Sequence, residues 1–347
     1  MHMVPQASVT GIVVVTLAGM SNGSFPAPSK GMRGWKWEHT WLVYSICAMG
    51  LLPIGLGAVF AHGLISRLAG SDLVLAGRVC LFGALWGLGS LLFGVSLPRL
   101  GMAVTNALVS GVLVLLGSLG PILTGVVHID GGHLLWLMGG LLLLTLSLVL
   151  CASASVSRDQ ARGLPSPNLR PQGHALWAVL IAVMAGALSS MLNMGFVVGA
   201  PLARNALSHG APALVASVAI WIPVLLGGLL FNVGYPVYLI CKGKSWDLFA
   251  RGPQCAGCWS RSLLMGILWF GAILLYGYGA SLMGHLGAVY GWALLIAISI
   301  LTSNTWGTVT GEWKSSGRKP KMLMWFSTAL LIFSFAILSA QRLGGSS

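Results

Sequence analysis

The segment Gly83-Ala-Leu-Trp-Gly-Leu-Gly-Ser-Leu-Leu-Phe-Gly94 recurs in altered form as Gly266-Ile-Leu-Trp-Phe-Gly-Ala-Ile-Leu-Leu-Tyr-Gly277. Six of the twelve positions are identical, including Trp86 and Trp269. A second match follows in the same order, since 100–108 and 286–294 share four of nine residues. A chain with 48 Gly can align with itself by chance, but the matched Trp and the common order favour a true repeat. Weak internal symmetry in an apolar chain is typical of transporters built from two repeated halves.

The composition identifies an integral membrane protein. The chain has 347 residues, of which 56% are hydrophobic and only 7% charged, and its mean hydropathy is +0.87. A soluble domain of this size carries far more charge. The net charge of +13 does not indicate nucleic-acid binding, because the Lys and Arg lie mostly in short connections between apolar spans.

Ten segments are long and apolar enough to cross a bilayer, which needs about twenty residues each. We therefore predict an all-α polytopic membrane protein with ten transmembrane helices, in two inverted five-helix repeats. The first repeat covers residues 1–153, a cytoplasmic linker covers 154–173, and the second repeat covers 174–347. Five spans per half is an odd number, so the second half enters the membrane in the opposite sense. The predicted spans are 8–28, 40–62, 76–97, 102–127, 133–153, 174–198, 211–240, 262–283, 286–310 and 322–341.

The distribution of basic residues predicts the orientation. The connections after the odd-numbered spans hold fifteen of the nineteen Lys and Arg. The positive-inside rule places these connections in the cytoplasm and both termini outside.

Prolines and polar residues interrupt several spans, which indicates backbone groups that must be satisfied inside the protein or by cavity water. The segment Asn22-Gly-Ser-Phe-Pro-Ala-Pro28 is loosely similar to Asn193-Met-Gly-Phe-Val-Val-Gly-Ala-Pro201 in the second half. Broken helices with polar residues at corresponding places of two halves predict a binding site near the bilayer midplane. A purely structural role for the prolines remains the alternative.

Aromatic and amide side chains in these spans predict a cavity for a small neutral ligand. An aromatic face packs against the C–H surface of a sugar, and amides bond its hydroxyls in both directions. The alternative is that the Asn residues link helices and the Trp residues lie at the interface. The candidates for the cavity are Asn22, Trp86, Ser90, Asn106, Asn193, Trp269, Tyr276, Tyr290, Trp292 and Asn304.

No enzyme chemistry, cofactor or metal site is predicted. All six acidic residues lie at span ends or in connections, and Cys255-Ala-Gly-Cys258 lacks a second pair of ligands. Glu38 follows Trp35-Lys-Trp37 and opens the second span, where it is the candidate proton carrier; helix capping or pairing with Lys36 is the alternative. Glu312 ends the ninth span, where it can pair with Lys314.

The sequence resembles the L-rhamnose–proton symporter family of the drug/metabolite transporter superfamily. The resemblance lies in Gly23–Lys30 leading to Trp35–Trp41, in Phe82–Gly87, in Leu192-Asn193 with Gly199-Ala-Pro201, and in Asn304–Lys314. It implies ten helices in two inverted halves, the bacterial inner membrane as the location, and import of L-rhamnose or a related neutral deoxysugar with H+ as the coupling ion. The third span departs from the enteric members at Ser90 and Leu92, where they carry Asn, and the eighth departs at Ala272, where they carry Gln.

Two other functions remain open from the sequence. One is export or facilitated diffusion of another small metabolite, since folds of this superfamily host both directions. The other is a membrane sensor or scaffold that binds a ligand without moving it. The repeat and the paired interruptions favour transport, because alternating access uses such symmetry.

Overall fold

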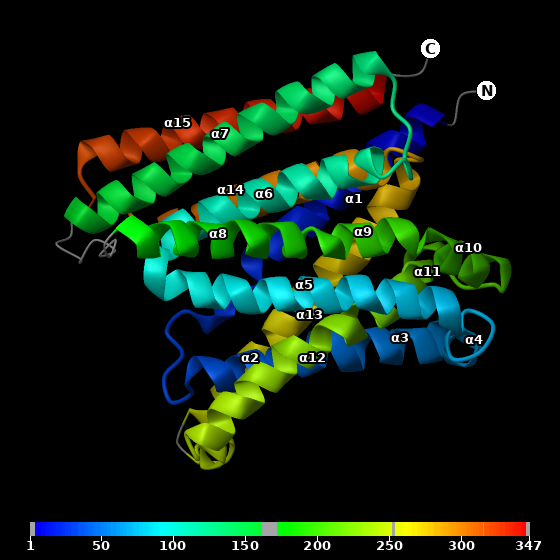
Figure 1. Cartoon of the computed structure of the whole chain (residues 1–347), viewed down its shortest axis with the longest axis horizontal. Helices are drawn as coiled ribbons and strands as arrows, with labels where there is room; N and C mark the ends of the chain where they lie inside the picture. Colours follow the sequence, from blue (N-terminus) through cyan, green and yellow to red (C-terminus); the bar gives the residue numbers. More distant parts are fainter. Residues whose placement is uncertain (1–3, 162–171, 252–253, 315, 345–347) are drawn as a thin grey trace.

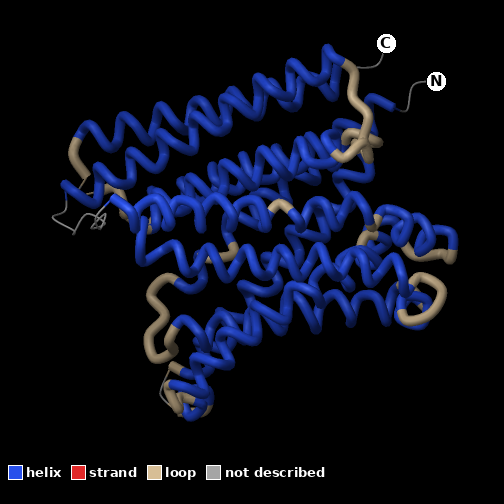
Figure 2. The backbone as a smooth tube through the Cα atoms, in the orientation of Figure 1, coloured by secondary structure: helices blue, strands red, loops and turns tan. Residues whose placement is uncertain are grey.

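The computed structural model describes residues 4–161, 172–251, 254–314 and 316–344, and Figures 1 and 2 show that helices make up most of this part of the chain. Helices of the first half are α1 (Val4–Ser24), α2 (Trp37–Ser45), α3 (Leu52–Phe60), α4 (Leu64–Leu68), α5 (Leu73–Leu100), α6 (Met102–Leu123) and α7 (Gly131–Ala161). Helices of the second half are α8 (Gln172–Ser189), α9 (Met191–Val198), α10 (Ala200–Ser208), α11 (Ala213–Ala216), α12 (Val218–Lys242), α13 (Cys255–Leu282), α14 (Gly287–Val309) and α15 (Arg318–Gly344). Short helical turns are η1 (Ala27–Ser29) and η3 (Trp246–Phe249), and η2 (Ile46–Leu51) is a π-helical segment.

The described residues contain ten segments that can cross a membrane, as predicted, and the protein is a multi-pass membrane protein. The second span is α2, η2 and α3 together, and the sixth is α8, α9 and α10 together. The predicted boundaries differ most at the end of the sixth span, which runs to Ser208 where 198 was predicted. The fifth span also extends further than predicted, because α7 continues as helix to Ala161 inside the predicted linker 154–173. Residues 162–171 of that linker lie outside the described residues.

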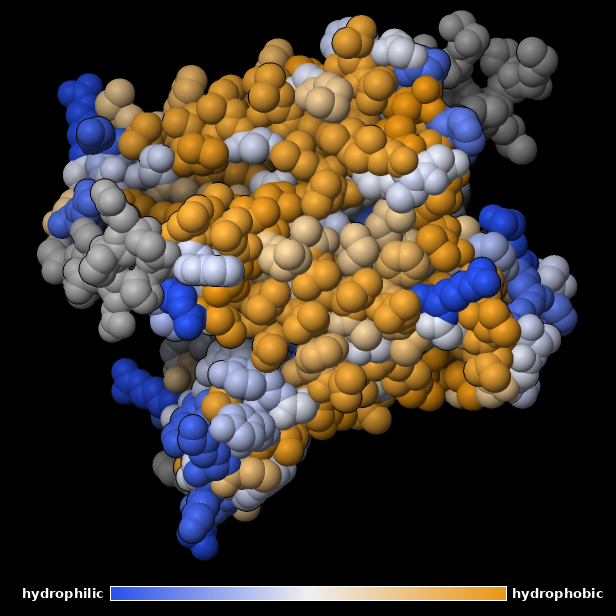
Figure 3. Space-filling model, viewed as in Figure 1, coloured by the Kyte–Doolittle hydropathy of each residue, from blue (hydrophilic) through white to orange (hydrophobic). Residues whose placement is uncertain are grey.

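The surface confirms that lipid, not water, surrounds the middle of the protein. Large apolar side chains point outward along the spans, with Leu135 75% exposed, Val74 72% and Leu142 69%. Figure 3 shows a broad apolar band across the helices, with polar residues gathered at the two ends. Such a surface is stable only where hydrocarbon covers it.

Five pairs of consecutive helix ends meet at one end of the molecule, on the left in Figure 1. They are the ends where α1 leads to α2, α5 to α6, α7 to α8, α12 to α13 and α14 to α15. We call this the basic end, because most of the Lys and Arg in the sequence lie in these connections or in the helix turns that flank them. The other end, on the right in Figure 1, holds α4 and α10 and lies near both termini, and we call it the opposite end.

Helices of the two predicted halves interlock. Helix α5 packs along α12, and α7 packs along α15. Helix α1 packs against α13 and α14, while α8 packs against α5 and α6. Two repeats related by a two-fold axis exchange partners in this way, with α1 corresponding to α8, α5 to α13 and α6 to α14. The repeat itself stays a prediction.

The Trp86 and Trp269 side chains, matched in the sequence alignment, lie against each other. Their ring centroids are 5.6 Å apart and their planes differ by 12°. Both are nearly buried, at 8% and 7% exposure. Offset stacking of this kind stabilises the contact between α5 and α13 beyond the burial of apolar surface.

Glycines permit the close crossing of α5 and α12. A Cβ atom at Gly83 would overlap the carbonyl oxygen of Val224, and one at Gly227 would overlap that of Cys80. The obstructing atoms belong to the backbone in both cases, so they cannot move aside as the end of a flexible side chain could. Small residues at helix contacts are how membrane helices gain dispersion energy where no hydrophobic effect drives them together.

Several prolines expected to interrupt spans lie within continuous helices. Pro223 and Pro236 lie inside α12, and Pro121 lies in the last turns of α6. The clear irregularities are the π-helical segment just before Pro53 and the two breaks at Ser190 and Gly199 in the sixth span. For Pro121 the freed carbonyl is that of Gly117, which accepts from the Asn193 amide of α9 at 2.8 Å.

Candidate functional site

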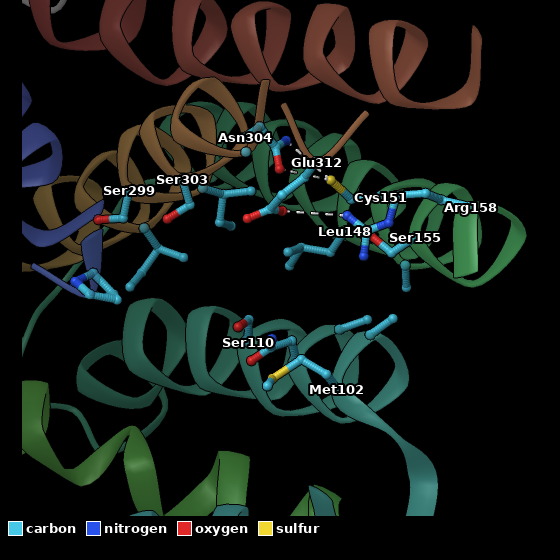
Figure 4. Close-up of a pocket in the computed structure, with 18 of the residues that line it drawn as sticks. Met102, Ser110, Leu148, Cys151, Ser155, Arg158, Ser299, Ser303, Asn304 and Glu312 are labelled. Atoms are coloured by element: carbon cyan, nitrogen blue, oxygen red, sulfur yellow. Dashed lines mark hydrogen bonds and ion pairs between the residues drawn. The ribbon is translucent and has the colours of Figure 1, made fainter. Parts of the chain in front are cut away.

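A cavity of about 420 Å³ lies between α6 on one side and α7 and α14 on the other, with the last turns of α1 at its edge. Figure 4 shows Met102 and Ser110 of α6 facing Leu148, Cys151 and Ser155 of α7, and Ser299 and Ser303 of α14. The volume falls within the range of about 300–1,000 Å³ that is usual for small-molecule sites.

Three of the predicted site residues, Asn22, Asn106 and Asn304, line this cavity. The Asn22 amide donates to Ser299 Oγ at 2.9 Å, and the Asn304 amide lies 3.1 Å from Cys151 Sγ. These contacts hold α1 to α14 and α14 to α7. The Asn22 and Asn304 side chains are therefore both interhelical links and part of the cavity wall.

Three polar side chains of the cavity wall have no hydrogen-bond partner among the described residues. They are Asn106 and Ser110 of α6 and Ser155 of α7. Asn106 and Ser110 are four residues apart, so they lie on the same face of α6. An amide and hydroxyls left free on facing helices can bind the hydroxyl groups of a neutral ligand in both directions.

Charged residues lie at the mouth of the cavity, near the basic end. The Glu312 carboxylate lies 2.6 Å from Lys30 Nζ and 3.5 Å from Arg158 Nη1. Arg158 also pairs with Asp159 at 2.9 Å and lies over the Trp313 ring, 4.9 Å from its centroid. Glu312 therefore pairs with Lys30 and Arg158, where the sequence suggested Lys314.

The cavity is closed toward the opposite end. Helices α6 and α14 run on beyond it, and there the Trp292 ring fills the space over Gly117 and its Nε1 donates to Leu113 O at 3.3 Å. Farther in, the fully buried Tyr276 hydroxyl donates to Asn193 Oδ1 at 2.5 Å. The α6–α14 contact is thus open at the basic end and packed shut at the opposite end.

Asn193 joins four helices in this closed region. It lies on α9, its amide donates to Gly117 O of α6 at 2.8 Å and to Ala288 O of α14 at 3.1 Å, and it accepts from Tyr276 of α13. A buried amide with all these partners costs little to bury, whereas an unpaired one is expensive in lipid.

The other predicted site residues lie outside the cavity wall. Trp86 and Trp269 are stacked in the core, and Tyr290 is buried with its hydroxyl donating to His133 O at 2.8 Å. The Ser90 hydroxyl bonds to Trp86 O in its own helix at 3.3 Å. Together with Asn193, Tyr276 and Trp292, they form packed structure in this conformation, and a contact with ligand stays a prediction for them.

Glu38 lies in the first turn of α2, half-buried, and does not line the cavity. Within the described residues it makes no ion pair, so the expected pairing with Lys36 is not seen. Its role as the proton carrier stays a prediction.

Sequence reasoning missed the small polar residues of the cavity wall. A signal for them exists in the spacing: Ser299 and Ser303 are four residues apart in α14, and Asn106 and Ser110 are four apart in α6. Such spacing puts polar groups on one face of an otherwise apolar span. Single Ser residues in a membrane helix are common, so only the stripe is informative.

Comparison with known proteins gives a consistent result over nearly the whole chain. The family model described as L-rhamnose-proton symport protein matches residues 4–343. A protein of Salmonella typhi named L-rhamnose-proton symporter is 24% identical over 337 residues, covering 94% of this chain and 96% of that protein. Proteins with the same name from Citrobacter koseri and Klebsiella pneumoniae are 23% and 24% identical with the same coverage.

Proposed function

The chain belongs to the L-rhamnose–proton symport protein family, and on that premise we propose that it imports L-rhamnose, or a related neutral deoxysugar, together with a proton. The observation that supports this most is the cavity, which lies at the basic-end side of the Trp292–Gly117 packing. It carries amide and hydroxyl groups on facing helices that have no hydrogen-bond partner among the described residues. One-sided access to a polar site among apolar spans is what a carrier that alternates between two sides requires.

We propose that the sugar occupies the space between α6, α7 and α14. Asn106, Ser110 and Ser155 are the groups available to its hydroxyls, because no protein partner competes for them among the described residues. Leu148, Ile296 and Phe25 supply apolar wall for the C–H surface and the methyl group of a deoxysugar. The aromatic residues predicted from sequence would meet the sugar only in another conformation.

We further propose that the basic end faces the cytoplasm in a bacterial inner membrane, with both termini outside, so that this conformation is open inward. The charge distribution supports it, since fifteen of the nineteen Lys and Arg in the sequence lie between an odd-numbered predicted span and the span that follows it.

Cysteine labelling tests this orientation. In a cysteine-free background, Ser208→Cys at the opposite end is expected to react with a membrane-impermeant maleimide in intact cells. Lys244→Cys at the basic end is expected to react only after permeabilisation, because both positions are exposed but on different sides. The reverse pattern would place the cavity mouth outside.

The sugar site is tested by L-rhamnose uptake into proteoliposomes under an imposed inward proton gradient. We expect Asn106→Ala to raise the KM about tenfold, because each lost hydrogen bond weakens binding by about 0.5–1.5 kcal/mol and the amide can make two. Ser155→Ala, with one hydroxyl to lose, is expected to raise it about threefold.

Ser153→Ala is the matched control for Ser155→Ala. Ser153 also lies on α7 and is exposed, and its hydroxyl donates to Val149 O of the same helix at 2.9 Å. An unchanged KM in Asn106→Ala would remove this cavity as the sugar site. Absence of rhamnose flux in the wild type, with flux of another solute, would overturn the proposed substrate.

A further inference from the structure

The cavity wall contains carboxylates, although no acidic residue lies at the centre of a span. Glu312 and Asp159 line it. The other acids have other surroundings: Asp72 accepts from Asn205 at 2.8 Å, Asp247 pairs with Arg251, and Glu38 lies on α2. Asp130 caps α7, where bonds from His133 lower the pKa of its carboxyl. Only Glu312 and Asp159, among the described residues, combine a carboxylate with a place in the cavity wall.

The two carboxylates differ in how their ion pairs are built. Asp159 pairs with Arg158, its neighbour in the chain, so a movement of helices leaves that pair intact. Glu312 lies in the connection after α14, while Lys30 follows α1 and Arg158 belongs to α7. Its ion pairs therefore join three separate segments, and relative motion of α1, α7 and α14 must change them.

We propose that Glu312 is the group that carries the coupled proton, and that Lys30 and Arg158 displace this proton when the cavity opens toward the basic end. This inference rests on the proposed symport function. In the release step the O–H bond of the Glu312 carboxylic acid breaks, the proton passes to cavity water, and the carboxylate oxygens take the two cations as partners. No other reactant is needed.

The geometry supports the direction of this step. Lys30 Nζ contacts Glu312 Oε1 and also donates to Thr310 Oγ1 at 3.1 Å, so it is held at the carboxylate. A proton on Glu312 and the two ion pairs compete for the same oxygens, and in this open conformation the ion pairs occupy them. Glu312 is 40% exposed, which leaves water access for the released proton.

The charges around Glu312 come from every segment packed near it. Lys30 follows α1, Arg158 and Asp159 end α7, and Lys314 shares the connection of Glu312. Lys321 of α15 reaches Lys314 O at 3.5 Å. Basic side chains therefore outnumber carboxylates at this mouth.

Glu312→Gln tests the proposal, because glutamine keeps the shape and cannot release a proton. Two activities are measured in proteoliposomes: sugar counterflow at equal pH on both sides, and accumulation under a proton gradient. For one proton per sugar, the wild type is expected to accumulate sugar about tenfold per pH unit. In Glu312→Gln we expect accumulation to fall to the equilibrium ratio of one while counterflow persists.

Asp247→Asn is the matched control, because this carboxylate also lies in a connection at the basic end but is paired within its own segment. Glu38→Gln tests the other candidate directly. Accumulation kept in Glu312→Gln, or lost only in Glu38→Gln, would overturn the assignment. Counterflow lost to the same extent as accumulation would also overturn it, since Glu312 would then act in structure or sugar binding.

Sugar flux in the wild type separates a failure of the proposed function from a failure of the Glu312 assignment. If the wild type shows no sugar flux under any gradient, the proposed function fails. If the wild type accumulates sugar and Glu312→Gln does so equally, the function stands and only the role of Glu312 is lost.

Discussion

Replacing Gly83 by Val is expected to prevent the protein from folding in the membrane. The new side chain would meet the Val224 backbone of α12, and its β-carbon alone already overlaps the carbonyl oxygen. Helices α5 and α12 would have to separate along the crossing that Gly83 shares with Gly227, and overpacking of a well-packed core costs about 1–3 kcal/mol or more. We expect little monodisperse protein by size-exclusion chromatography in detergent, and a lower unfolding temperature for any that remains.

Gly94→Val is the control for this prediction. Gly94 lies on the same helix, is exposed and has no heavy atom within 4 Å of the position where a Cβ would stand. The Gly94→Val substitution removes a flexible residue from a helix, so the stability of the protein should stay the same or rise slightly. Equal behaviour of Gly83→Val and Gly94→Val would show that α5 and α12 do not cross as closely as described.

Replacing Tyr276 by Phe is expected to weaken the closed side of the protein. The hydroxyl is buried and donates to Asn193 Oδ1, so its removal leaves that oxygen without its partner. Hydrogen bonds between membrane helices contribute about 1–2 kcal/mol. We expect this hydrogen bond to be absent in the conformation that is open at the opposite end. A loss of about 1.4 kcal/mol in the stability of the closed conformation then shifts the equilibrium about tenfold toward the open one.

The measurement is the unfolding temperature of Tyr276→Phe in detergent, with Tyr278→Phe as the matched control. Tyr278 lies on the same helix and its hydroxyl makes no hydrogen bond within the described residues. We expect a drop of several degrees for Tyr276→Phe and no measurable drop for Tyr278→Phe. Equal values would mean that the Tyr276–Asn193 bond contributes nothing to stability.

The closed and open parts of the α6–α14 contact explain why the predicted site residues separate into two groups. Asn106 and Asn304 lie toward the basic end of their helices, where the cavity is open. Trp292 and Tyr290 lie on the same helix as Asn304 but toward the opposite end, where the packing is tight. A carrier that alternates exposes different parts of one contact in different states, so a single conformation brings only some of its ligand groups together.

The sequence by itself determined the number of spans, the membrane environment and the family. Each follows from local properties: stretches of about twenty apolar residues, a scarcity of charge, and motifs such as Asn304–Lys314 that can be read along the chain. The expectation of a polar cavity with Asn22, Asn106 and Asn304 also came from the sequence, since an amide in an apolar span needs a partner, water or a ligand.

Only the tertiary structure decided which polar groups are already paired and which remain free. Asn193 and Asn106 look alike in the sequence, yet Asn193 is bonded to three other helices, while Asn106 lines the cavity and has no hydrogen-bond partner within the described part of the chain. The partners of Glu312 likewise come from residues 282 and 154 positions away, Lys30 and Arg158. Pairing of this kind depends on how distant helices cross, and the spacing of residues along one helix carries no record of it.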